Sequence, residues 1–185
     1  MHGGGIMQRW KFVTLAAIAW FSVAFLQSCD TRERPITGSS LPSFTLPGVP
    51  GDSVRSADYA GKTLLVVFWA THCPPCLMEI PMLKNLQASL GGQGFQVIGI
   101  SLDDDPATVL PKAQARFAFN YPIAIGNAQV VADFGNFDAI PTAFLVGPDG
   151  KIRERLVGVH PESELRAKIA AAMAVVPTPA PASQP

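Results

Sequence analysis

The chain has 185 residues, of which 48% are hydrophobic, and its 14 Lys and Arg balance 14 Asp and Glu. This length is enough to bury the core of one domain and does not require a second. Because the sequence has neither a net positive charge nor a basic cluster, it gives no reason to expect a nucleic acid partner or a polybasic attachment to anionic lipid.

The first 28 residues have the layout of a secretory signal. Arg9 and Lys11 precede an apolar run over 12–26, which is shorter than the roughly 20 residues that usually span a membrane. We therefore expect residues 1–28 to be a signal peptide. Its removal would leave 12 basic and 14 acidic residues, a net charge of −2.

Composition then divides the rest of the chain. Residues 29–40 are polar and include a proline and a glycine, which predicts a tether. We expect the folded domain over 41–175, opening with extended pieces around 41–47 and 53–55. The Pro- and Ala-rich tail over 176–185 cannot pack a core and is expected to be disordered.

The most informative stretch joins a strand to a helix. An apolar run over 64–69 predicts a buried strand, and a helical pattern begins at Pro74 and runs to about Leu90. Cys73 and Cys76 are therefore expected at a helix N-terminus, where a thiolate is favoured. Since they are too close in sequence to link distant parts of a fold, a redox role is favoured over a structural one.

Strands and helices alternate after this helix, which predicts parallel strands joined by right-handed connections. Near the end, Asp149-Gly150 is a strong signal for a hairpin turn. The later strands are expected over 95–102, 121–125, 142–146 and 152–157, and the later helices over 106–119, 128–134 and 161–175.

Three adjacent acids, Asp103, Asp104 and Asp105, precede one of these helices. Such a cluster is compatible with a metal site, but no other ligand types accompany it. Carboxylates are also stabilised at the positive end of a helix. We interpret the three as a solvated cap, and we expect no metal site.

The end of the signal resembles the lipobox of bacterial lipoproteins. Leu26-Gln27-Ser28-Cys29 fits that pattern at Leu26 and Ser28, while Gln27 is a less typical occupant. The resemblance implies a lipid on Cys29, and Asp30 after it implies retention at the inner membrane, facing the periplasm. The alternative is an uncleaved or differently cleaved signal with Cys29 as a free thiol.

The strand-to-helix stretch resembles the thioredoxin fold. It reads Trp-Ala-Thr-His-Cys-Pro-Pro-Cys over 69–76, and Ile140-Pro141-Thr142 follows later in the chain. With Glu79 three residues after Cys76, the chain is similar to membrane-tethered TlpA/ResA/CcmG (DsbE)-type thiol:disulfide oxidoreductases over about 41–174. A zinc half-site has the same CxxC spacing, but its second half is missing here.

This resemblance implies an α/β, thioredoxin-like fold with a central mixed sheet flanked by helices. It also implies an N-terminal extension and an insertion before a cis-proline at Pro141. In such a fold Cys73 is expected to attack and Cys76, one turn further along, to resolve the mixed disulfide. Glu79 is expected to accept protons near the thiols, with a solvated surface acid as the alternative. Cys73, Cys76, Glu79 and Pro141 form the expected catalytic set.

Six further residues are expected to contact the substrate. Pro74 and Pro75 lack backbone N–H donors, so they stabilise a thiolate less and favour a reductant. His72 replaces the commoner Trp; a protonated imidazole there would make the site more oxidising, and a solvent-facing His without effect is the alternative. Trp69 is expected to shield the site, and the backbone of Ile140 is expected to pair with substrate. The six residues are Trp69, His72, Pro74, Pro75, Ile140 and Thr142.

The implied activity is protein-disulfide reduction, with the Cys73–Cys76 disulfide as the redox group and no cofactor. Electrons would come from a membrane thiol carrier of the DsbD/CcdA type. The substrates would be oxidised protein thiols, such as apocytochrome c during cytochrome c maturation or copper-site proteins. The alternatives are a disulfide oxidant or isomerase in the same fold, and a Cu(I) metallochaperone, against which the lack of a nearby Met or His cluster argues.

Overall fold

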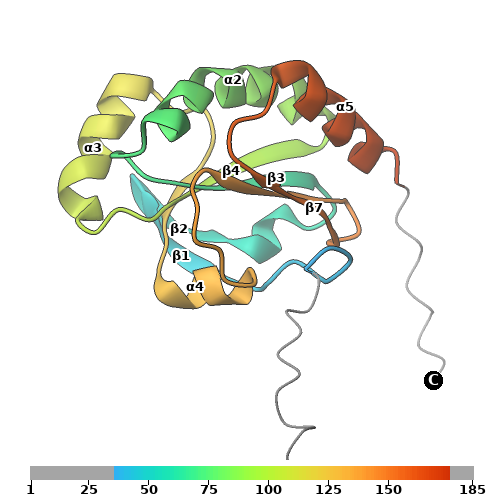
Figure 1. Cartoon of the computed structure of the whole chain (residues 1–185), viewed down its shortest axis with the longest axis horizontal. Helices are drawn as coiled ribbons and strands as arrows, with labels where there is room; N and C mark the ends of the chain where they lie inside the picture. The colour runs from blue at the N-terminus through green and yellow to red at the C-terminus, as the bar shows by residue number, and fades with distance from the viewer. Residues whose placement is uncertain (1–35, 176–185) are drawn as a thin grey trace, which may run out of the picture. The chain divides into compact units, whose positions relative to one another are not determined.

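The computed structural model describes residues 36–175, which form one seven-stranded mixed sheet with helices on both faces (Figure 1). The strand order is β2-β1-β5-β4-β3-β6-β7. The expected mixed sheet flanked by helices is therefore confirmed. The strands are β1 Thr45–Val49, β2 Gly51–Arg55, β3 Thr63–Trp69, β4 Phe95–Ser101, β5 Ile123–Ile125, β6 Thr142–Val146 and β7 Ile152–Val157; the helices are α2 Pro74–Leu90, α3 Pro106–Phe117, α4 Ala128–Asp133 and α5 Glu162–Met173, with 3-10 turns η1 Ser56–Tyr59 and η2 Gly91–Gln93.

Strand β3 lies at the centre of the sheet. It pairs parallel with β4 and antiparallel with β6, and all seven of its residues are buried. Alternate side chains enter two cores: Leu65 and Val67 join the cluster that includes residues of α2, α3 and α5, while Val66 and Phe68 join the cluster that includes α4. Burial on both faces explains why this strand is a continuous apolar run in the sequence.

Several element boundaries differ from the expected ones by one or more residues, and the backbone explains two of these differences. The first hairpin turns at Val49 and Pro50, between the paired residues Gly48 and Gly51, which is later and tighter than expected. Gly51 has a φ of +92°, which glycine adopts without strain. Helix α3 ends at Phe117, two residues early, because Ala118 adopts a left-handed conformation with φ 46°. The α2 helix and the β6–β7 hairpin lie where they were predicted.

The residues just before Leu41 lie on the domain, although a tether was expected to extend to residue 40. The Gly38 amide donates to the Ile152 carbonyl at 2.7 Å, and the Ile152 amide donates to the Ser39 carbonyl at 2.9 Å. Ile36 packs against the core cluster that includes α4. The predicted signal peptide, Cys29 and the predicted tail over 176–185 lie outside the described residues. Within residues 36–175, the helices are too short or too polar to cross a membrane.

Candidate active site

Cys73 and Cys76 are joined by a disulfide at the beginning of α2. Cys73 is the N-cap residue of the helix, and its Sγ accepts a hydrogen bond from the Cys76 amide at 3.3 Å. Pro74 and Pro75 occupy the first two helical positions, where an N–H would have no partner within the helix. Cys73 is 7% exposed and Cys76 is 2% exposed, so Cys73 is the more accessible of the two residues.

The loop before β6 lies against the disulfide. The Ile140 carbonyl oxygen lies 3.7 Å from Cys73 Sγ, and the peptide bond between Ile140 and Pro141 is cis. The Pro141 carbonyl accepts a hydrogen bond from the Gly158 amide at 2.8 Å. Thr142 is fully buried, and its hydroxyl donates to the Ala139 carbonyl at 2.7 Å. The structure therefore brings Ile140 to Cys73, whereas the Thr142 side chain braces the loop from inside.

Exposed apolar side chains surround this part of the molecule. Val157 and Val159 flank Gly158, which is bonded to Pro141, and both are exposed. Pro74, Pro75 and Met78 are exposed on the first turns of α2. These residues give a polypeptide an apolar surface beside the disulfide.

Glu79 is a buried acid one turn after Cys76 on α2. The residue is 4% exposed, and burial raises the pKa of its carboxyl to about 7. The pKa of the Tyr121 hydroxyl is also raised, first by its own burial and then by the negative charge of Glu79. The alternative of a solvated surface acid is wrong for Glu79. A carboxyl with this pKa takes up and releases a proton at neutral pH.

Trp69 lies in the core and not on the surface around the disulfide. Its side chain packs in the cluster that includes α2 and α3, with its ring 5.5 Å from that of Phe119. Within the described residues its indole Nε1 is buried without a hydrogen-bond partner. Trp69 is buried because β3 is covered on both faces, and it lies in the same core cluster as Cys73 and Cys76. Its expected role in shielding the site stays a prediction.

Asp103 was missed as a site residue, and the expectation that it belongs to a solvated cap is wrong. Its side chain is 4% exposed and accepts hydrogen bonds from the Thr71 amide at 3.0 Å and the Thr71 hydroxyl at 2.6 Å. The Ser101 hydroxyl donates to its other oxygen at 2.8 Å. Asp103 thus ties the end of β4 to the loop that carries Cys73. The sequence does contain a clue to this position. Asp103 follows β4, which was expected to run parallel to β3, and the carboxyl ends of neighbouring parallel strands lie together.

The other two acids of the run behave as expected for a helix start. Asp105 caps α3 by accepting a hydrogen bond from the Thr108 amide at 3.4 Å, and Asp104 is exposed. His72 is 70% exposed, with its Nδ1 3.5 Å from Asp103 Oδ1. The imidazole therefore lies between solvent and a buried carboxylate, and both interpretations of His72 stay predictions.

Glu79→Gln is predicted to change how folding stability depends on pH. Since the folded pKa is raised from 4.5 to about 7, the stability from the protonated carboxyl is complete below pH about 4.5 and is lost as pH rises through 7. At ~1.36 kcal/mol per pKa unit this loss is on the order of 3 kcal/mol. Urea unfolding of the oxidised proteins should therefore show the variant gaining stability over wild type between pH 4 and pH 8. A difference that does not change with pH, or one matched by the exposed Asp52→Asn, contradicts the assignment.

Asp103→Ala is predicted to destabilise the fold by about 2 to 4 kcal/mol, because it leaves the Thr71 amide and two hydroxyls without their acceptor. Urea unfolding measures the loss, and hydrogen exchange of the Thr71 amide should become faster. Asp104→Ala is the matched control, since Asp104 is the exposed neighbour. Equal stabilities for the two variants would show that the Asp103 contacts contribute nothing.

Comparison with known proteins agrees with this geometry. The DsbE thiol:disulfide interchange protein of Pseudomonas fluorescens is 34% identical over 173 residues, covering 89% of this chain and 94% of that relative. The thiol-disulfide oxidoreductase ResA of Geobacillus kaustophilus is 29% identical over 153 residues, covering 83% of this chain and 86% of the relative.

A solved structure and a family model extend the similarity. A thiol:disulfide interchange protein of the thioredoxin family from Chlorobium tepidum superimposes with a TM-score of 0.68 at 27% identity, covering 73% of this chain and 96% of that one. The model of the Redoxin family matches residues 36–172. The chain therefore belongs to the Redoxin family and has a thioredoxin-like fold.

Proposed function

We propose that the chain is a thiol:disulfide oxidoreductase that reduces disulfides in exported proteins. The observation that carries this proposal is the Cys73–Cys76 pair at the start of α2, beside the Ile140 carbonyl. Relatives named thiol-disulfide oxidoreductase and thiol:disulfide interchange protein support it.

The reaction follows from the different positions of the two sulfurs. The Cys73 thiolate attacks one sulfur of a substrate disulfide, so that a mixed disulfide forms and the first substrate thiolate leaves. The Cys76 thiolate then attacks Cys73 Sγ, which releases the second substrate thiolate and forms the Cys73–Cys76 disulfide. The leaving thiolates take up two protons, and two electrons pass from the cysteine pair to the substrate.

Glu79 supports the second step. Cys76 is buried, so its thiol must transfer its proton within the protein before it can attack. Glu79 lies three residues further along α2, on the same side of the helix, with a pKa of about 7. It is therefore suited to take this proton at neutral pH and to return it when the pair is reduced again.

The proposed direction of electron flow is supported by the small number of hydrogen bonds to Cys73 among the described residues. Strongly stabilised thiolates make oxidants. Cys73 Sγ accepts one hydrogen bond, from the Cys76 amide, and Pro74 and Pro75 have no amide to add. This supports a reductant over an oxidant or isomerase.

Location and partners complete the proposal. A lipid on Cys29 would hold the domain at the periplasmic face of the inner membrane, which loss of palmitate labelling in Cys29→Ser tests. There the pair would be reduced by a thiol carrier of the DsbD/CcdA type. Its substrates would be oxidised protein thiols, among them the haem-binding pair of apocytochrome c or the thiols of copper-site proteins.

The redox potential of the Cys73/Cys76 couple tests the proposed direction. The full-length Cys29→Ser variant, whose only cysteines are this pair, is equilibrated with glutathione or dithiothreitol mixtures. The fraction of reduced protein is measured by alkylation of the free thiols and mass spectrometry. We expect a potential near that of thioredoxin, about −270 mV, and far below the about −120 mV of DsbA. A value near that of DsbA would overturn the reductant assignment, and stoichiometric retention of Cu(I) would favour a metallochaperone instead.

A further inference from the structure

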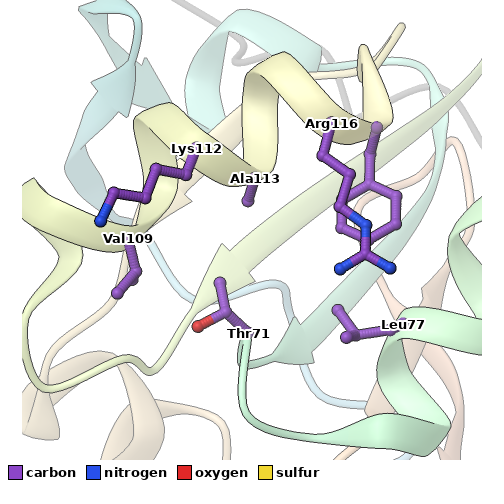
Figure 2. A pocket seen from close by; sticks show the side chains of 7 residues that line it. Thr71, Leu77, Val109, Lys112, Ala113 and Arg116 are labelled. Carbon is purple, nitrogen blue, oxygen red and sulfur yellow. The ribbon is translucent and has the colours of Figure 1, made fainter.

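A groove runs between α2 and α3, starting beside the disulfide. Its first hollow, of about 210 Å³, has an apolar floor that includes Leu77 of α2 and Val109 and Phe117 of α3. Thr71, two residues before Cys73, also lines this hollow (Figure 2). A second hollow of about 230 Å³ continues along α2 past Ile80 and Pro81. We call the two hollows together the α2–α3 groove.

Three cations line this groove. Lys112 and Arg116 belong to the first hollow, Arg116 lines both, and Lys84 belongs to the second. Figure 2 shows the Arg116 guanidinium extending from α3 toward Leu77 of α2. The Lys84 ammonium is already bonded to the Phe117 carbonyl at 2.6 Å, so Lys112 and Arg116 are the cations available to a ligand.

These two cations have no carboxylate partner among the described residues. Within residues 36–175 neither Lys112 nor Arg116 lies within ion-pair distance of a carboxylate, and neither hollow is lined by one. Elsewhere on the domain, Arg153, Arg166 and Lys168 are each paired with a carboxylate at 2.6 to 2.7 Å. The groove is therefore a positive strip on a domain in which acids outnumber Lys and Arg.

The position of the groove indicates what occupies it. Leu77 directly follows Cys76, so a ligand on the groove floor lies beside the disulfide. The floor favours apolar side chains and the rim favours carboxylates, a combination that an acidic polypeptide segment offers. The groove lies on the α3 side of the redox pair, whereas Val157 and Val159 are next to Pro141 on β7 and the loop that follows it.

We infer that the α2–α3 groove binds an acidic, partly apolar segment of the polypeptide that exchanges disulfides with Cys73, with Lys112 and Arg116 contacting its carboxylates. This inference rests on the proposed function and adds a specificity determinant to it. The contact brings the partner to the redox pair and selects against basic partners, because like charges at an interface oppose binding.

The test uses the full chain, reduced, with two synthetic peptides that are each closed by one disulfide. The peptides share a Leu-containing sequence and differ in flanking residues, Glu in one and Lys in the other. Wild type should reduce the Glu peptide with the higher kcat/KM, and the preference should shrink at high ionic strength. Lys112→Glu/Arg116→Glu should lower kcat/KM for the Glu peptide on the order of tenfold and raise it for the Lys peptide.

Two controls separate the possible outcomes. Lys151→Glu makes a single charge reversal at an exposed lysine, at the end of the β6–β7 hairpin away from Pro141, and should leave the preference unchanged. Reduction of bis(2-hydroxyethyl) disulfide, which is small and uncharged, should proceed at the wild-type rate in every variant. The groove assignment is overturned if Lys151→Glu lowers kcat/KM for the Glu peptide as much as the double charge reversal does. It is also overturned if the peptide preference is unchanged both in Lys112→Glu/Arg116→Glu and in Lys112→Gln/Arg116→Gln. No reduction of the small disulfide by wild type overturns the proposed function itself.

Discussion

The site depends on how two parallel strands end together. Strands β3 and β4 pair over their full length, from Thr63 with Phe95 to Trp69 with Ser101, so the loops that follow them emerge side by side. Asp103 on one loop then binds the amide and hydroxyl of Thr71 on the other. Because Cys73 follows Thr71 by two residues and caps α2, this clamp fixes where the helix starts and where the reactive sulfur lies.

Burial sets the chemistry that this junction supports. The same packing that covers β3 on both faces also encloses Cys76 and Glu79 on the inner side of α2. Burying Glu79 raises the pKa of its carboxyl to about 7, at a cost in stability above that pH. A stability cost at a position suited to proton transfer is typical of functional groups. Pro74, Pro75 and Met78 are exposed on the outer side of α2, so this side of the helix is accessible to a protein partner.

Much of this arrangement could be predicted from local sequence. The continuous apolar run of β3, the prolines at the first turn of α2 and the Asp-Gly of the hairpin each fix their element within a few residues. Trp69 could be assigned to a buried strand from the apolar run, and its burial agrees with that assignment. Asp103 could not be placed in this way, because its partner Thr71 is 32 residues away and meets it only through the β3–β4 register. The α2–α3 groove likewise needs the packing of two helices that are separated by a strand.

We propose that Cys73 meets the substrate and that Cys76 stays inside to resolve the mixed disulfide. Trapping of the mixed disulfide tests this most directly, using Cys76→Ser and Cys73→Ser in a Cys29→Ser background with a fluorescent disulfide peptide. We expect Cys76→Ser to accumulate a peptide adduct on Cys73, mapped by mass spectrometry, and Cys73→Ser to accumulate little. An adduct that forms on Cys76 in Cys73→Ser as fast as on Cys73 in Cys76→Ser would contradict it.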